Sequence, residues 1–113
     1  MNISKLATKP QLQEIKLDDQ DIVDSYGEII TFWMKDHLDL ATYFDFYKFQ
    51  QESSSDQLMN TLRKIILNEE GKQAIEDDCI LPVDITLAVM VKINENLGKS
   101  KAKSSKKKVG TQV

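Results

Sequence analysis

The apolar residues of this chain change their spacing at Asp39, and no other feature of the sequence constrains the fold as much. Before Asp39, residues 14–17 alternate polar and apolar side chains, and residues 29–34 are rich in β-branched and aromatic types, as in short strands. After Asp39, apolar residues recur every three or four positions, as on helices that bury one face. The sequence therefore predicts an α+β fold, in which a short antiparallel strand pair is followed by about three helices.

Residues with known preferences for helix ends mark most of the expected boundaries. Residues 21–26 fit one helical turn that Gly27 stops, and Asp39 is placed to cap the helix that follows. The serine run at 53–55 interrupts the helical pattern, and a second apolar stripe follows over residues 58–66. These signals predict two helices between Asp39 and residue 66.

The segment 83–97 fits two patterns. Apolar residues occupy every second position from Val83 to Ile93, as in a strand, but the other phase is not polar because it contains Ala88 and Met90. The length of the segment and Pro82 at a first helical position favour a helix. We predict a helix that is apolar nearly all round. Such a helix is normally buried, and in so small a protein another chain could bury it.

The formal net charge of −3 combines two unlike segments. Six basic residues and no acidic residue lie after Gly98, so residues 1–98 carry nine basic and eighteen acidic side chains, a net of −9. The basic residues of this tail are Lys99, Lys101, Lys103, Lys106, Lys107 and Lys108. Because the tail has few bulky apolar residues, we expect residues 99–113 to be disordered. We expect a flexible arm over 1–12 and a single small interaction domain over 13–98.

The counts of reactive residues exclude several common sites. The 113-residue chain has one Cys and one His, so it can form neither an internal disulfide nor a zinc site with four Cys and His ligands. A nucleophilic site would rest on His37 alone, and no hydroxyl or thiol lies near it in the sequence. Counted from Asp19, Val23 and Asp24 break the calcium-loop pattern. We therefore expect no catalytic residue, no metal ligand and no cofactor.

Five of the eight aromatic residues lie within residues 43–49. One face of the expected helix carries Leu40, Tyr43, Phe44 and Tyr47. Phe46 and Phe49 point to its far side, which leaves two interpretations open. Either a two-sided core covers all these residues, or Phe46 and Phe49 form an exposed patch of the kind that marks a partner surface. Under the second interpretation, the candidate client or self interface consists of Phe46, Phe49, Met59, Leu87 and Val91.

The Lys-rich tail has three open interpretations: contact with phosphates, contact with an acidic protein surface, or a contribution to solubility. It contains no aromatic residue for base stacking, so base recognition is not indicated and a nucleic-acid partner is not the favoured one. No run approaches the roughly 18 apolar residues that span a bilayer, so no membrane partner is expected. An unpaired Cys79 is consistent with a reducing cytoplasm.

Two groups of short motifs follow one another along the chain. The first group is Ile15-Lys16-Leu17-Asp18-Asp19, Ile22-Val23, Tyr26-Gly27-Glu28 and Ile30-Thr31-Phe32-Trp33 with Asp36 soon after. The second group is Leu67-Asn68-Glu69-Glu70-Gly71, Asp77-Asp78, Leu81-Pro82-Val83-Asp84-Ile85 and Leu97-Gly98-Lys99. In this order, over most of residues 11–99, the motifs resemble the small tail assembly chaperones of long-tailed bacteriophages.

The resemblance implies a non-enzymatic protein that acts in the host cell cytoplasm and is absent from the mature virion. Such chaperones bind and solubilise the tape measure protein and help to recruit the tail tube protein around it. The resemblance also implies a longer frameshift product of the same gene, for which Lys106–Lys108 could be encoded by a slippery stretch. Because many copies would cover one client, we expect a homo-oligomer.

Two alternative functions stay open beside this one. The first is a structural component of the virion that takes part in tail or head completion. The second is a nucleic-acid-associated accessory factor that acts through the Lys-rich tail.

Overall fold

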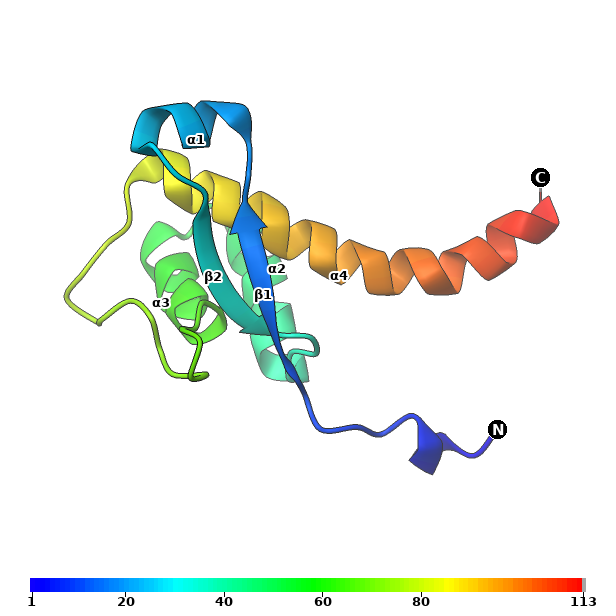
Figure 1. The fold of residues 1–113 in the computed structure, drawn as a ribbon. Helices are drawn as coiled ribbons and strands as arrows, with labels where there is room; N and C mark the ends of the chain where they lie inside the picture. Colours follow the sequence, from blue (N-terminus) through cyan, green and yellow to red (C-terminus); the bar gives the residue numbers. More distant parts are fainter. Residues whose placement is uncertain (113) are drawn as a thin grey trace. The chain divides into compact units, whose positions relative to one another are not determined.

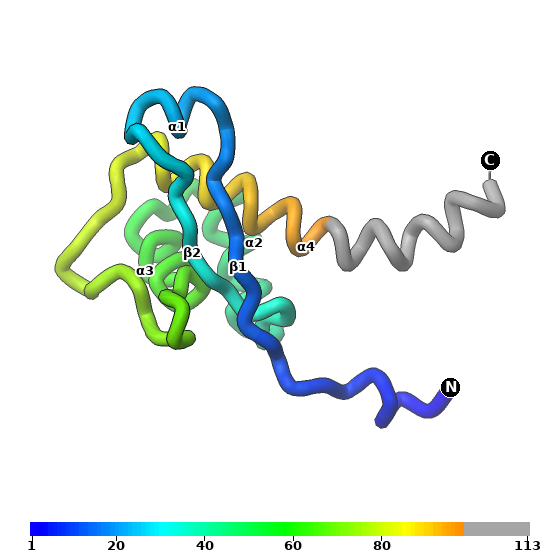
Figure 2. The backbone as a smooth tube through the Cα atoms, in the orientation of Figure 1, coloured from blue at the N-terminus to red at the C-terminus, as the bar shows by residue number. Residues whose placement is uncertain are grey.

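The computed structural model describes residues 1–112, with side chains for residues 1–98, and divides the chain into two compact units. The first unit comprises Met1–Lys16 and Thr31–Ile80, and the second comprises Leu17–Ile30 and Leu81–Val113. The prediction of a single domain over 13–98 did not distinguish these units. The predicted tail over 99–113 lies outside the residues described with side chains, as Figure 2 shows in grey.

The predicted strand pair is confirmed. β1 (Leu12–Leu17) and β2 (Ile30–Lys35) form a two-stranded antiparallel sheet, in which burial alternates along each strand. An isolated antiparallel bridge joins Trp33 of β2 to Leu67, and each of these residues donates its backbone N–H to the carbonyl of the other, at 3.0 and 2.7 Å. Before the sheet, a short 3-10 turn, η1 (Ile3–Lys5), lies in an exposed arm.

Two of the predicted helices complete the first unit. α2 (Leu40–Glu52) and α3 (Ser55–Ile65) pack against each other and lie behind the strands in Figure 1. Asp39 caps α2 as predicted, and Ser53 ends it in the left-handed conformation, with φ 54°. The buried apolar side chains of this unit are Ile15, Phe32, Met34, Phe46, Leu62, Ile65, Ile66 and Ile75.

The orientation of α2 corrects the predicted interface. Phe46 is only 1% exposed and Phe49 is half-buried, so the expected Phe46–Phe49 patch is wrong for Phe46. The two-sided core is not formed either in the described chain, because the face of α2 opposite Phe46 is exposed. That exposed face carries Leu40, Phe44 and Tyr47, at 66%, 58% and 54% exposure.

The buried side of α2 tolerates its polar residues because they are satisfied locally. The Gln50 side-chain amide donates to the Phe46 carbonyl at 3.2 Å, and the Thr42 hydroxyl donates to the Asp39 carboxylate at 2.7 Å. Partly buried polar groups that keep their hydrogen bonds cost little on folding. Sequence periodicity alone did not indicate which of the two faces lies in the core.

The second unit contains two helices. α1 (Gln20–Tyr26) ends at Gly27, as predicted, where a φ of 79° suits glycine and the Gly27 N–H donates to the Val23 carbonyl at 2.8 Å. α4 (Val83–Gln112) begins directly after Pro82, so the ambiguous segment is a helix and not a strand. α1 runs alongside the first turns of α4 (Figure 1).

The prediction that α4 is apolar on more than one side is also confirmed. Ile85, Val89 and Ile93 are at most 4% exposed, and they share one face at positions i, i+4 and i+8. The residues Val83, Leu87 and Val91 repeat the same spacing on the opposite face. Their exposed fractions are 74%, 56% and 53%, so one apolar face of α4 is buried and the other is open.

A matched pair of substitutions tests the orientation of α2. Phe46→Ala should lower the free energy of unfolding by about 3–5 kcal/mol, because it removes a fully buried ring and leaves a cavity. Phe44→Ala removes the same ring from an exposed position on the same helix and should lower stability by about 1 kcal/mol or less, through loss of the contact with Tyr43. Urea unfolding followed by circular dichroism measures both values. Equal losses in the two variants would contradict this orientation.

Candidate interaction surfaces

An exposed apolar stripe runs along α2. It consists of Leu40, Phe44 and Tyr47, which we call the α2 stripe, at the i, i+4 and i+7 positions of one helix face. Half-buried Tyr43 borders it, and the Tyr43 and Phe44 rings lie 5.7 Å apart at an interplanar angle of 52°, a favourable tilted aromatic pair. Three large apolar side chains, each more than half exposed, form a continuous patch of the kind that marks partner surfaces.

Local hydrogen bonds fix the start of the helix that carries this stripe. The Asp39 carboxylate accepts from the Thr42 backbone N–H at 3.1 Å and from the Thr42 hydroxyl at 2.7 Å. These bonds stabilise the charged carboxylate, the side-chain bond most strongly, and so lower the pKa of Asp39. The cap orders the first turn of α2 and with it the backbone of Leu40.

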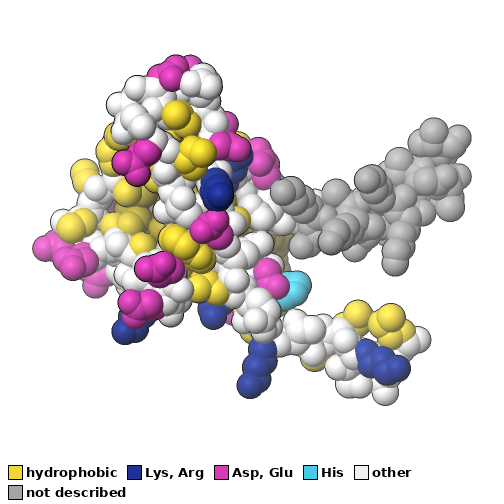
Figure 3. Space-filling view, in the orientation of Figure 1, with side chains coloured by type: hydrophobic (Ala, Val, Ile, Leu, Met, Phe, Trp, Pro, Cys, Tyr) yellow, Lys and Arg dark blue, Asp and Glu magenta, His cyan; other side chains and the backbone are white. Residues whose placement is uncertain are grey.

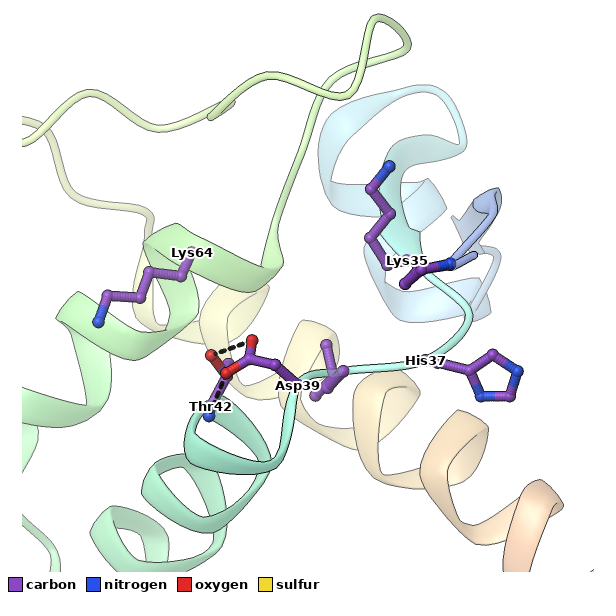
Figure 4. A pocket seen from close by; sticks show the side chains of 7 residues that line it. Lys35, His37, Asp39, Thr42 and Lys64 are labelled. Carbon is purple, nitrogen blue, oxygen red and sulfur yellow. Dashed lines mark hydrogen bonds between the residues drawn. The ribbon is translucent and has the colours of Figure 1, made fainter. Parts of the chain in front are cut away.

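A hollow of about 360 Å³ opens beside this cap (Figure 4). Its lining consists of Pro10, Lys35, His37, Leu38, Asp39, Thr42 and Lys64. Figure 4 shows the His37 ring and the Lys35 and Lys64 ammonium groups turned away from the Asp39 carboxylate, which Thr42 already occupies. The charged groups of this hollow therefore do not converge on one point, as they would have to for binding or proton transfer.

A second exposed stripe lies on α4. It consists of Val83, Leu87 and Val91, which we call the α4 stripe. Two polar contacts tie α4 to α1 and to Asp18, two residues before α1. The Tyr26 hydroxyl donates to the Asp84 carboxylate, at 3.1 and 3.2 Å from its two oxygens. The Lys92 ammonium lies 3.5 Å from Asp18.

These contacts set which face of α4 is open. Asp84 and Lys92 lie two turns apart on α4. Tyr26, the partner of Asp84, ends α1, and Asp18, the partner of Lys92, precedes α1, so the two helices run antiparallel. Desolvation and then the Asp84 contact raise the pKa of Tyr26, so the hydroxyl stays protonated and able to donate at neutral pH. The α4 stripe is therefore carried on a helix whose rotation is fixed by its own unit.

The sequence-predicted interface residues fall into three groups. Leu87 and Val91 are exposed, and both belong to the α4 stripe. Met59 and Phe49 are half-buried, with the Lys48 ammonium 5.8 Å from the centre of the Phe49 ring. Phe46 is buried. The six lysines of the predicted electrostatic tail, Lys99, Lys101, Lys103, Lys106, Lys107 and Lys108, lie outside the residues described with side chains.

Sequence reasoning missed the α2 stripe because it assigned that face to the core. Together with Tyr43, the stripe places four large side chains on one face of α2, and a face of this kind normally points inward. The one signal in the sequence was the presence of aromatic residues on both faces, which left open whether one face is exposed and, if so, which one.

Three ligand-type side chains gather on the loop before α4. Glu76, Asp78 and Cys79 place donor atoms within 4.8 Å of one another, although the sequence analysis expected no metal ligands. All three residues are exposed, and the Cys79 sulfur lies 3.6 Å from an Asp78 oxygen. Exposed acidic groups often lie close together without a metal, so we assign no site to this cluster.

Among the described residues, no helix combines the length and apolar character needed to cross a membrane.

Substitutions at Asp39 test the cap. Asp39→Ala should lower the free energy of unfolding by about 1 kcal/mol, whereas Asp39→Asn should cost much less because Asn also caps helices. The lowered pKa stabilises the folded state at pH values above the unfolded carboxyl pKa, and this contribution is lost as the pH falls through the folded pKa. The Asn variant should lack this acid-side loss in urea titrations across pH. If the stability of Asp39→Asn fell with decreasing pH as steeply as that of the wild type, the acid-side loss of stability would belong to other groups.

Comparisons of the chain with protein-family models, with curated proteins and with solved structures found no match.

Proposed function

We propose that this protein is a tail assembly chaperone of a long-tailed bacteriophage, which binds and solubilises the tape measure protein and promotes assembly of the tail tube around it. The α2 stripe carries the proposal, because it is an ordered, exposed apolar surface that the described chain leaves uncovered. The order of short motifs over residues 11–99 supports the same family.

The shape of the α2 stripe suits a helical client. A tape measure segment is a long amphipathic helix, whose apolar face needs cover until the tube forms. Helix recognition uses apolar side chains at i, i+3 or i+4, and i+7, and Leu40, Phe44 and Tyr47 present this spacing. Aromatic side chains supply large contact areas, and apolar surfaces of this type accept partners of varied sequence. Both properties suit a client whose sequence changes along its length.

The α4 stripe provides a second apolar surface of a different character. Its Val and Leu side chains are smaller than the aromatic rings on α2 and lie in a straight row along the helix. We assign Leu87 and Val91 to contacts with the client or with further copies of the chain, as their exposure allows. Many copies along one client require such additional contacts, so the proposal includes a homo-oligomer.

The charge of the folded part supports a solubilising role. Residues 1–98 carry a net charge of −9, and acidic side chains predominate over basic ones on the surface seen in Figure 3. A bound copy would therefore cover apolar client surface and present a negatively charged one to water. Net charge of one sign keeps assemblies apart in solution.

The proposal places the protein in the host cell cytoplasm and not in the mature virion, together with a longer frameshift product of the same gene. Mass spectrometry of purified particles separates this function from that of a structural tail or head-completion component, which would be retained. Deletion of residues 99–113 separates it from a nucleic-acid accessory factor, because the deletion should leave solubilisation of the tape measure protein largely intact.

A double substitution in the α2 stripe tests client binding. When co-expressed with the tape measure protein of the same phage, the Phe44→Ser/Tyr47→Ser variant should keep at least about tenfold less of that protein soluble. The physical reason is that aromatic anchors at the centre of an interface typically contribute about 2 kcal/mol or more each. Ultracentrifugation of the lysate and quantification of the supernatant measure the effect.

The controls use the same helix and the other stripe. Gln51→Ala changes an exposed polar residue one turn beyond the stripe and should leave solubilisation unchanged. Leu87→Ser/Val91→Ser tests the α4 stripe separately. Full solubilisation by the Phe44→Ser/Tyr47→Ser variant, with its thermal unfolding unchanged, would reject the α2 stripe as the client surface.

A further inference from the structure

The two edges of the sheet differ in what they offer a partner. The backbone N–H of Asp36 donates to the carbonyl of Gln11 at 2.8 Å, and the bounds of the strands continue this register, so Ile15 lies opposite Phe32. On the far edge of β2, Trp33 is bridged to Leu67. β1 has no third strand beside it in the described chain, because the sheet contains only β1 and β2.

The register identifies which backbone groups of β1 are free to pair. In an antiparallel pair, successive residues direct their N–H and C=O groups alternately toward the partner strand and away from it. Gln11 bonds to Asp36, directly after β2, so Gln13 and Ile15 also face β2, and Glu14 and Lys16 direct their backbone groups to the open edge. Among the described residues, no hydrogen bond from outside the strand pair reaches the backbone of Glu14 or Lys16.

Charged residues on an edge strand usually prevent pairing, but the charges of β1 alternate in sign. Glu14 and Lys16 are 47% and 59% exposed and lie on one side of the strand, with 3.7 Å between the carboxylate and the ammonium group. In an antiparallel pairing with a second β1, only the register centred on Ile15 places Glu14 opposite Lys16 in both directions. Registers centred on Glu14 or on Lys16 place like charges opposite each other, which is unfavourable.

We propose that two copies of this chain pair through the open edges of their β1 strands, antiparallel and centred on Ile15, to form a continuous four-stranded sheet. Glu14 of each copy then exchanges backbone hydrogen bonds with Lys16 of the other copy, and their side chains form two symmetric ion pairs. A closed twofold interface of this type uses the same surface on both copies. It also converts a marginal two-stranded sheet into one with four strands.

The inference concerns self-association of the chain alone, so it does not depend on the identity of the client. It also assigns a surface separate from the two apolar stripes, since it uses backbone groups and charges of β1. Loss of client binding by the α2 stripe variants and loss of β1 pairing would therefore be observed separately.

Charge exchange at two exposed positions tests the pairing. Glu14→Lys places two lysines on the edge and Lys16→Glu places two glutamates there, so each variant alone should have a dimer dissociation constant raised by about tenfold or more. An equimolar mixture of the two variants should form heterodimers, because opposite charges face each other again. The double variant Glu14→Lys/Lys16→Glu should dimerise like the wild type. Sedimentation velocity over a concentration series from micromolar to millimolar measures all four proteins.

Amide hydrogen exchange gives a second, register-specific readout. On dimerisation, the backbone N–H groups of Glu14 and Lys16 should gain protection, whereas that of Ile15, which already faces β2, should change little. A wild-type chain that stays monomeric at millimolar concentration would overturn the proposal. So would single variants that dimerise as strongly as the wild type, or a mixture of the two that shows no recovery.

Discussion

Burial of Phe46 determines what the first unit can present to a partner. The ring is only 1% exposed, and α2 can turn only one face inward. Because aromatic residues occupy both faces of α2, placing Phe46 in the core leaves Leu40, Phe44 and Tyr47 in solvent. The same packing choice therefore stabilises the fold and creates the α2 stripe. A chain of this size cannot enclose all the apolar side chains that it carries.

The second unit reaches a similar result by different means. Ile85, Val89 and Ile93 are buried, while the polar contacts of Tyr26 with Asp84 and of Lys92 with Asp18 hold α1 along α4. Exposed ion pairs and hydrogen bonds add little stability, but they limit how the helix can rotate. The α4 stripe is thus a fixed feature of its unit. In each unit, one helix has two apolar faces: α2 in the first unit and α4 in the second. One face of each helix is buried and the other is exposed.

Local chemistry made much of the fold predictable from the sequence. Alternation marked the strands, Gly27 and Asp39 marked helix ends, and Pro82 resolved the ambiguous segment in favour of a helix. The face of α2 was not predictable in this way, because it depends on the packing of α2 against α3, which the local sequence does not specify. The bridge from Trp33 to Leu67 is also long-range and left no sequence signal. Of the candidate interface, Leu87 and Val91 lie on the exposed face of α4, and their role in an interface stays a prediction.

The uncovered surfaces differ in the kind of recognition they permit. Apolar stripes such as those on α2 and α4 gain contact energy from area and shape, so they accept many amphipathic partners in several registers. A strand edge is different. Its backbone hydrogen bonds fix the distance between the two strands, and the order of Glu14 and Lys16 fixes their pairing register. A protein that must bind a long client of changing sequence and also meet its own copies in one arrangement needs both kinds of surface. The apolar stripes suit the variable partner, and the charged strand edge suits the invariant one.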